Sequence, residues 1–279
     1  MHRLIPVVVC VSVALQCQTS PKPLSQVEAC SRFMSRAVRI DVADGRATGF
    51  IVSQDGWILT AAHVVLDPQT GERRHAVAIQ LPDGSSQLAQ VFIDTESVIR
   101  DFALLKVEKT GLPFLELGTE SEVSPGSDIT IIGYPFSAES AYTASINTKF
   151  CLSGMVAATD TIVEHGVNIN AIYFQGPAVK GISGGPIISR DTGHVVGIQS
   201  QKLAGIGVEL NDIRKQLVAG KSNMTVRFTG VDLADSLIGI IDVMDRHLVN
   251  ELGSGTGASD VAYALKKARR EYERQHPRK

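Results

Sequence analysis

Short runs of apolar, often β-branched residues alternate with polar turn residues from residue 37 to about residue 208. The clearest runs lie at residues 38–42, 49–53, 77–81, 102–107, 129–132 and 195–199, with Gly, Pro, Asp and Asn between them. Runs of this length and spacing are typical of an all-β sandwich or barrel rather than of alternating helices and strands. The segment is long enough to form two barrels.

Helical patterns flank this segment. A short helix is predicted over residues 27–35. Towards the C-terminus, the pattern predicts a helix from about Asp232 to Leu252, a glycine-rich break at residues 253–257, and a second helix from about Ser259 to Gln275. The second helix carries an apolar stripe at helical spacing, formed by Val261, Leu265, Ala268 and Tyr272.

The other faces of this last helix are rich in Lys and Arg. We expect both C-terminal helices to pack on the second barrel and the last one to leave its basic faces in water. The alternative is that the basic cluster at residues 266–270 docks an acidic partner or an anionic membrane.

The N-terminal residues show the pattern of an export signal. An apolar run at residues 4–15 follows His2 and Arg3, and it is too short for a membrane-spanning helix, which needs about 20 apolar residues. Residues 1–20 are therefore predicted to be a signal peptide. Cys17 offers the alternative of a lipoprotein signal, although Gln16 stands where such signals have a small residue. Membrane contact is expected only if Cys17 is lipidated.

Removal of the signal would leave Cys30 and Cys151 as the cysteines of the mature chain. An oxidising compartment would allow a disulfide between them, but the sequence does not show whether their Cα atoms are close enough. Two buried free thiols are the alternative.

Overall charge and composition exclude several classes of function. The chain has 27 Lys and Arg against 29 Asp and Glu, so its formal net charge of -2 gives no electrostatic reason to expect nucleic acid as a partner. The seven histidines and four cysteines lack metal-ligand spacing, and the glycine-rich residues 181–185 lack the lysine and hydroxyl residue of a phosphate loop. We therefore expect neither a metal ion nor another cofactor.

Three residues carry candidate chemistry. His63 follows an apolar run, Asp101 precedes one, and Ser183 lies in a glycine-rich bend. Each has an ordinary structural explanation alone, but together their types and order match nucleophilic catalysis. A serine hydroxyl is a weak nucleophile that needs an adjacent base, and histidine suits this role near neutral pH. Asp101 would accept the other ring N–H and stabilise the imidazolium.

The bend around Ser183 suits a second requirement of this chemistry. The oxyanion of a tetrahedral intermediate must be met by backbone N–H groups with no side chain in the way. Gly181 and Ser183 are the predicted donors of this oxyanion hole. Gly184 and Gly185 are expected to serve the backbone of the bend and its close packing.

These segments resemble the signatures of trypsin-like serine peptidases. The resemblance rests on residues 60–63 (Thr-Ala-Ala-His), 101–105 (Asp-Phe-Ala-Leu-Leu) and 181–186 (Gly-Ile-Ser-Gly-Gly-Pro), and it covers roughly residues 37–217. Within that family, residues 52–59 and 205–213 are more similar to bacterial HtrA-type proteases than to digestive enzymes.

The resemblance implies a chymotrypsin-like, all-β fold of two antiparallel six-stranded β-barrels, with the triad in the cleft between them. The protease domain would span residues 27–224, with barrels at about residues 37–120 and 121–224. Residues 225–279 would form a C-terminal helical extension. This extension is too short and wrongly patterned for the PDZ domain that HtrA-type proteases usually carry.

The resemblance also implies how a substrate binds. One wall of the specificity pocket would be formed by Gly197, Ile198, Gln199 and Ser200. The substrate would pair with this strand as an added β-strand. Ile182 stands where many family members have an aspartate that pairs with a newly cut N-terminus, so activation by that ion pair is not expected. Residues 175–181 contain no acidic side chain, which favours a small or medium apolar residue before the scissile bond.

The residues and the resemblance together predict a serine endopeptidase that cleaves exported or envelope proteins, in the periplasm or outside the cell. Its partner would be a polypeptide substrate. A protein-binding module without proteolytic activity and a hydrolase of small esters are the alternatives. The sequence leaves the oligomeric state open.

Overall fold

The computed structural model describes most of the chain beyond the predicted export signal. The described residues are 22–42, 45–67, 70–135, 148–179, 181–202, 208–220, 227–228, 231–247 and 252–277. The predicted signal peptide at residues 1–20 and the lipidation site at Cys17 lie outside these ranges. Among the helices within them, none has a stretch long and apolar enough to cross a membrane.

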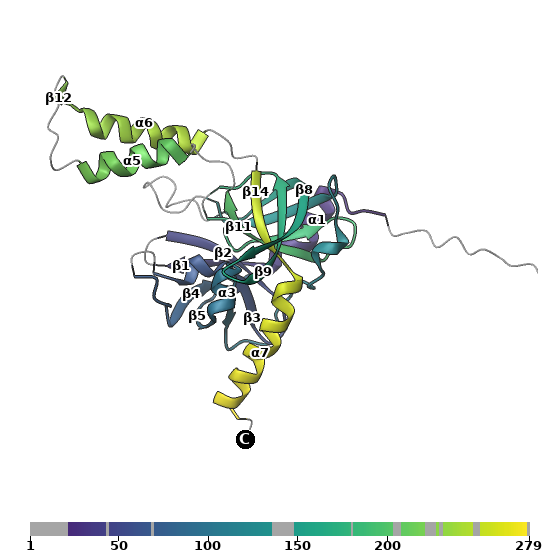
Figure 1. Cartoon of the computed structure of the whole chain (residues 1–279). Coiled ribbons are helices and arrows are strands. Elements are labelled where there is room, and N and C mark those ends of the chain that lie inside the picture. Colours follow the sequence, from purple (N-terminus) through teal and green to yellow (C-terminus); the bar gives the residue numbers. More distant parts are fainter. Residues whose placement is uncertain are drawn as a thin grey trace, which may run out of the picture.

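The first half of the chain forms a closed antiparallel barrel (Figure 1). Its strands are β1 (Ala37–Val42), β2 (Gly45–Ile51), β3 (Trp57–Thr60), β4 (Ala76–Gln80), β5 (Ser86–Phe92) and β6 (Ala103–Lys106). They pair in the order β1-β2-β3-β6-β5-β4. Fully buried aliphatic side chains, among them Ile40, Ile58 and Leu105, fill the interior. Two short helices interrupt the strands: α2 (Ala62–Val65) after β3 and α3 (Thr95–Ile99) after β5.

The second half forms another closed antiparallel barrel. Its strands are β7 (Asp128–Gly133), β8 (Phe150–Glu164), β9 (Val167–Gln175), β10 (Pro186–Ser189), β11 (Val195–Lys202) and β14 (Leu252–Gly257). They pair in the order β10-β11-β14-β9-β8-β7. A 3-10 turn, η2 (Glu120–Glu122), lies in the connection between the barrels. The predicted all-β fold of two six-stranded antiparallel barrels is confirmed.

Strand β14 corrects the predicted end of the second barrel. The glycine-rich residues 253–257, predicted to be a break between helices, pair with both β11 and β9 and close the barrel. Glycine is required here by close packing, because a Cβ on Gly255 would lie 2.4 Å from the carbonyl oxygen of Ile198. The second barrel therefore does not end at residue 224, and the predicted domain boundary there is wrong.

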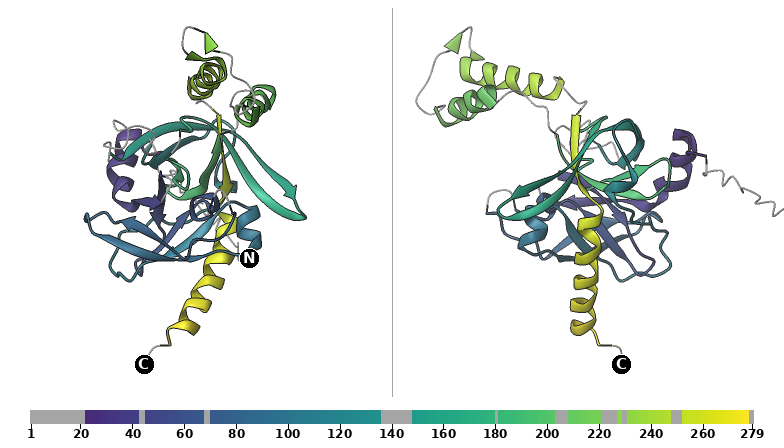
Figure 2. Two further views of the ribbon diagram at one scale, coloured as in Figure 1. Left: turned by 90° about the vertical axis from the view of Figure 1, so that its left-hand side faces the viewer. Right: turned by 45° about the vertical axis from the view of Figure 1, so that its right-hand side comes forward.

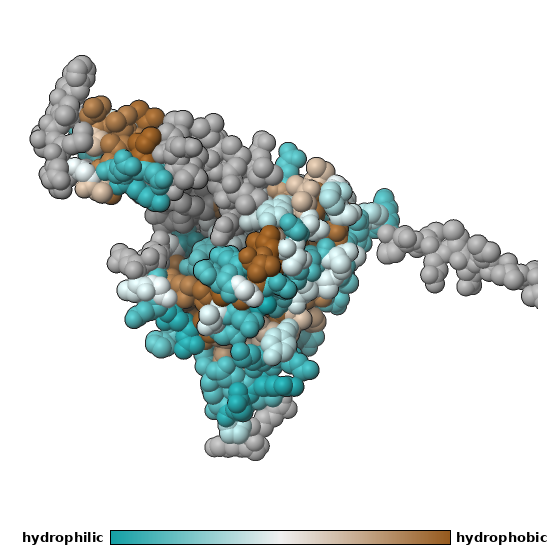
Figure 3. All heavy atoms as spheres, viewed as in Figure 1, coloured by the Kyte–Doolittle hydropathy of each residue, from teal (hydrophilic) through white to brown (hydrophobic). Residues whose placement is uncertain are grey.

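The chain between β11 and β14 forms a helical insertion in the barrel. It contains α5 (Val208–Gly220), a two-stranded hairpin of β12 (Arg227–Phe228) and β13 (Val231–Asp232), and α6 (Leu233–His247). Helix α6 matches the predicted helix from Asp232, except that it ends before the predicted position. The two helices stand away from the barrels (Figure 2), so the expectation that the helix from Asp232 packs on the second barrel is wrong. Apolar atoms gather on their surface (Figure 3), where Leu237 and Ile240 are exposed.

Helix α7 (Ser259–Gln275) has the bounds predicted for the last helix. Its apolar stripe is in contact with the core, and Val261 and Ala268 are buried. The helix continues from β14 of the second barrel across to the first barrel (Figure 2). There the Tyr272 ring packs against Trp57 and Phe92, with ring centroids 6.0 and 6.3 Å away. The helix thus bridges both barrels, whereas the prediction placed it on the second barrel alone.

The N-terminal helix α1 (Gln26–Phe33) confirms the short helix predicted before the strands. Ser25 and Glu28 form a capping box that begins it. A disulfide joins Cys30 of this helix to Cys151 of β8, with Cα atoms 5.8 Å apart. The two cysteines are therefore paired and are not free thiols, and the disulfide fixes α1 to the second barrel.

Candidate active site

His63 and Asp101 form a close pair at the edge of the first barrel. All four side chains of β3 are buried, and the one-turn helix α2 that follows presents His63 as an exposed side chain between the buried Ala62 and Val64. The ring Nδ1 lies 2.9 Å from Asp101 Oδ2 and 3.1 Å from Oδ1. The backbone N–H of His63 also donates to Oδ1, at 3.0 Å. Because a carboxylate only accepts, the ring proton resides on Nδ1 and leaves Nε2 as an acceptor.

Asp101 lies in an unusual backbone conformation. Its N–H donates to the carbonyl of Val98, and the N–H of Phe102 donates to that of Ser97, which together form the Schellman motif that ends α3. Asp101 occupies the left-handed position of this motif with φ 53°. Glycine is the usual residue there, and another residue costs on the order of 1–2 kcal/mol. In this backbone conformation the carboxylate lies against the ring and the backbone N–H of His63.

Ser200 supplies a further contact that the sequence did not reveal. Its hydroxyl donates a hydrogen bond to Oδ2 of Asp101. We predicted Ser200 only as part of the substrate-binding wall. The contact joins β11 of the second barrel to the end of α3 in the first, so only the packing of the barrels reveals it.

The pKa values of the pair move apart. Burial lowers the pKa of His63, but the hydrogen bond and negative charge of Asp101 raise it by more, so the net pKa lies above its ordinary value. The side chain is 49% exposed, so water reaches the ring and moderates the effect of burial. Burial raises the pKa of Asp101, but the hydrogen bonds and charge of His63 and the Ser200 hydroxyl lower it by more. Asp101 is therefore ionised at neutral pH.

The loop that carries Ser183 is fixed to both barrels. From the first barrel, the N–H of Thr48 donates to the Ser183 carbonyl at 3.0 Å, and its hydroxyl donates to the Gly181 carbonyl at 2.7 Å. From the second barrel, the Gln199 carbonyl accepts from Gly184 at 2.7 Å. The loop therefore has a defined position relative to both halves of the molecule.

Gly184 brings this loop against the segment that leads to His63. A Cβ on Gly184 would lie 2.2 Å from Thr60 Oγ1 and 2.8 Å from the Ala61 nitrogen, and its φ of 82° also requires glycine. The structure thus brings the Ser183 loop next to the end of β3. In the described part of the chain, no hydrogen bond joins the Ser183 hydroxyl to His63. Such bonds are often loose before substrate binds.

The predicted oxyanion donors lie in the same loop. Gly181 has a φ of 98°, and neither its N–H nor that of Ser183 forms a hydrogen bond with another described residue. Ile182 between them is fully buried in the second barrel's core. It packs on Gly133, where a Cβ would lie 2.8 Å from Ile182 Cγ2. Apolar packing of Ile182 therefore holds this loop, at the position where the family resemblance implies an aspartate in many members.

In the predicted substrate-binding strand, the first two residues are paired on both sides and the last one is not. Gly197 and Ile198 pair with β10 on one side and β14 on the other, so their backbone groups lie within the barrel wall. The N–H of Gln199 donates to the Gly185 carbonyl at 2.8 Å. The pairing with β10 ends at Ile198, and a register shift at Ser200 follows in the pairing with β14.

The potential metal ligands in the described ranges are the side chains of His, Cys, Asp and Glu. Within those ranges, no three His, Cys, Asp or Glu side chains gather closely enough to hold a metal ion.

Two closed six-stranded barrels with a His–Asp pair where they meet define the chymotrypsin-like class of folds. The trypsin-like peptidase domain matches residues 47–198, more than half of the chain. The chain therefore belongs to the trypsin-like peptidase family.

Several relatives point to the HtrA-type branch. "Serine protease HTRA1" of Xenopus laevis is 37% identical over 182 residues, covering 63% of this chain and 36% of that protein. "Probable periplasmic serine endoprotease DegP-like" of Halomonas elongata is 34% identical over 155 residues, covering 55% and 29%. The chain thus spans about a third of the length of these relatives and is homologous to HtrA-type serine proteases.

The solved structures agree on the fold. The HtrA-type protease AlgW, in a substituted form with a decapeptide, has a TM-score of 0.53 at 20% identity, covering 66% of this chain and 60% of that one.

Proposed function

We propose that the protein is a serine endopeptidase with His63, Asp101 and Ser183 as its catalytic triad. The observation that carries this proposal is the double hydrogen bond between His63 and Asp101, next to a glycine loop that presents Ser183. Asp101 fixes the ring so that Nε2 is free to accept a proton. The membership of the family and the names of the relatives support the same activity.

The reaction follows from the roles of these groups. The Ser183 hydroxyl attacks the substrate carbonyl and transfers its proton to Nε2 of His63. The N–H groups of Gly181 and Ser183 stabilise the oxyanion. The imidazolium, stabilised by Asp101, then protonates the leaving amine, and water releases the acyl group from Ser183 by the same sequence of proton transfers.

The substrate is an extended polypeptide. Beyond Ile198, the edge of β11 that faces the Ser183 loop lacks a partner strand among the described residues. An added substrate strand can pair from Ser200 onward, while Gly197 and Ile198 support this wall from inside the barrel and Gln199 holds the Ser183 loop. The approach to Ser183 at residues 175–181 lacks an acidic side chain, so the preferred residue before the scissile bond is small or medium and apolar.

The protein acts after export from the cytoplasm, in the periplasm or outside the cell. The disulfide between Cys30 and Cys151 supports this location, because such bonds persist in oxidising compartments. The apolar run at residues 4–15 suits a signal peptide. Cys17 provides a lipid anchor if the signal is of the lipoprotein type.

The test is labelling of the purified protein with a fluorophosphonate probe, which reacts with activated serines. We expect labelling at Ser183, mapped by mass spectrometry, and its loss in Ser183→Ala and His63→Ala. Cleavage of casein would identify a peptidase, whether or not a p-nitrophenyl ester is also hydrolysed. Hydrolysis of the ester without cleavage of casein would identify an esterase, and folded protein that is not labelled would identify a binding module; either would overturn the proposal.

A further inference from the structure

Helix α7 contacts both ends of α3, the short helix that carries Asp101 at its end. At the start of α3, Asp94 caps the helix by accepting the N–H of Ser97 at 2.9 Å. The other oxygen of Asp94 accepts from Lys267 of α7 at 2.6 Å. At the end of α3, Arg100 Nε lies 3.8 Å from Asp260 Oδ2 at the start of α7. The two helices are thus joined at two separate points.

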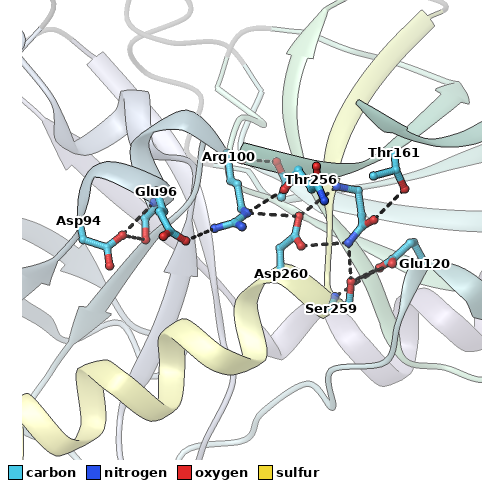
Figure 4. Close-up of polar contacts among 11 residues, drawn as sticks. Asp94, Glu96, Arg100, Glu120, Thr161, Thr256, Ser259 and Asp260 are labelled. Carbon is cyan, nitrogen blue, oxygen red and sulfur yellow. Dashed lines mark hydrogen bonds and ion pairs between the residues drawn. The ribbon is translucent and has the colours of Figure 1, made fainter. Parts of the chain in front are cut away.

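Arg100, the residue before Asp101, is held by several further contacts (Figure 4). Its guanidinium donates to Glu96 at 2.8 Å and to the Asn168 carbonyl at 3.1 Å. The hydroxyl of Thr256, on β14, donates a hydrogen bond to the Arg100 carbonyl. This carbonyl belongs to the peptide that joins Arg100 to Asp101, so the contact acts directly on the backbone that orients the catalytic carboxylate.

The start of α7 is itself fixed in place (Figure 4). Asp260 accepts from the side chain of Asn170 at 2.9 Å and from its backbone N–H at 3.1 Å. The Ser259 hydroxyl donates to Glu120 at 2.7 Å. Through β9 and η2, the second barrel therefore holds the groups that hold Arg100.

We propose that Thr256 and Asp260, at the junction of β14 and α7, position Asp101 for its role beside His63. A residue in a strained backbone conformation persists only where its surroundings fix it. The left-handed conformation of Asp101 has such support in the Arg100 carbonyl contact and in the contacts at both ends of α3. This inference rests on the proposed triad and assigns Thr256 and Asp260 as positioning residues that do not touch the substrate.

The first test replaces Thr256, which is buried, with the nearly isosteric valine. We expect Thr256→Val to slow the maximal rate of fluorophosphonate labelling at Ser183 by about tenfold, because small misplacements of catalytic groups have large effects on rate. The concentration of probe that gives half the maximal rate should change by less than about twofold, since the substitution does not alter the binding of the probe before it reacts. Thr256→Ser retains the hydroxyl and should restore the rate.

The matched control is Thr130→Val. Thr130 is also buried in the second barrel and also donates its hydroxyl to another element, to Gln26 at 2.9 Å. The Thr130→Val protein should lose a comparable amount of stability but keep the wild-type labelling rate. Equal labelling rates in Thr256→Val and Thr130→Val would show that the Thr256 contact is only structural and would overturn the inference.

A second pair of variants covers the case in which Thr256→Val does not fold. Asp260→Asn removes the charge opposite Arg100, and Asp55→Asn removes the carboxylate that contacts Arg269 elsewhere between α7 and the first barrel. Labelling should slow in Asp260→Asn and stay unchanged in Asp55→Asn. An unchanged rate in Asp260→Asn would overturn the role of that residue.

Proton NMR separates this inference from the proposed activity. The Nδ1 proton of His63, hydrogen-bonded to Asp101, should give a downfield resonance in the wild-type protein whether or not Ser183 is reactive. This resonance should shift or broaden in Thr256→Val and Asp260→Asn, and remain in Thr130→Val and Asp55→Asn. If the wild type is not labelled but the resonance responds in this way, the activity fails and the positioning role stands. A resonance that all four variants leave unchanged overturns the positioning role.

Discussion

The hydroxyl of Ser200, on the second barrel, donates a hydrogen bond to the carboxylate of Asp101, on the first. The same carboxylate accepts both the ring and the backbone N–H of His63. One acidic side chain thus receives donors from both barrels, at the place where they meet. The geometry of the proposed triad depends on the relative position of the barrels as well as on the local structure of each.

Ser200→Ala should reduce activity without disturbing the fold. A hydrogen bond to a charged group contributes about 1.5–3 kcal/mol, and we expect its loss to slow fluorophosphonate labelling by about tenfold. Ser189→Ala is the control, because Ser189 is a buried serine on β10 whose hydroxyl, among the described residues, accepts from its own turn, from the N–H groups of Asp191 and Thr192. Equal rates in the two variants would contradict a role for the Ser200 contact.

The raised pKa of His63 predicts the pH dependence of activity. The base must be neutral, so the labelling rate should rise with pH through a midpoint above the ordinary histidine value. Asp101→Asn removes the negative charge that raises this pKa and replaces one of the two acceptor oxygens with an N–H donor, so the midpoint should move to lower pH. The maximal rate should fall on the order of ten-thousand-fold. A midpoint that stays in place would show that Asp101 does not set the pKa of His63.

Gly184→Ala should disrupt the Ser183 loop. The new Cβ would meet Thr60 and the carbonyl oxygen of Thr48, at 2.2 and 2.3 Å, and we expect a loss of stability of about 2–3 kcal/mol from overpacking and backbone strain. Labelling should be almost abolished. Gly126→Ala is a matched control, because Gly126 also has a positive φ but open space around it. Chemical denaturation and labelling of both variants will check this expectation.

Loss of the disulfide should lower stability but leave the chemistry intact. Replacing both Cys30 and Cys151 with alanine should reduce the free energy of unfolding by about 2–5 kcal/mol, measured by guanidinium denaturation. The labelling rate at low temperature should stay near that of the wild type, because the bond joins α1 to β8 and touches none of the triad. Reduced wild-type protein should show the same loss. Unchanged stability would mean that the bond adds no constraint.

The barrels could be predicted from the sequence because most of their strands are short runs rich in β-branched residues and are separated by turn residues. The motifs around His63 and Asp101 also indicated their pairing, since each lies directly beside a buried strand. Strand β14 could not be predicted in this way. Its three glycines are typical of a break, and they are explained only by close neighbours in the fold: Phe174 at Gly253, Ile198 at Gly255 and Glu120 at Gly257.

Contacts between distant segments were also beyond the sequence. The Ser200 hydrogen bond and the disulfide join residues about 100 or more positions apart, and residue types alone do not reveal such distances. Helix α7 was recognised from its apolar stripe, but the sequence gives no sign that Tyr272 reaches Trp57 of the first barrel. The function of that helix beside α3 emerges only from the packing.

The position of β14 in the chain has a consequence for how the protein folds. During synthesis, β7 to β11 are complete before residues 203–251 and then β14 follow. Until β14 arrives, β9 and β11 lack the neighbour that joins them, and open edges of this kind invite wrong pairing. Closure of the second barrel is therefore expected to follow the pairing of its other five strands. The Thr256 contact with the Arg100 carbonyl can form only then, so a growing chain would carry all three residues of the proposed triad before it has the contact that positions Asp101.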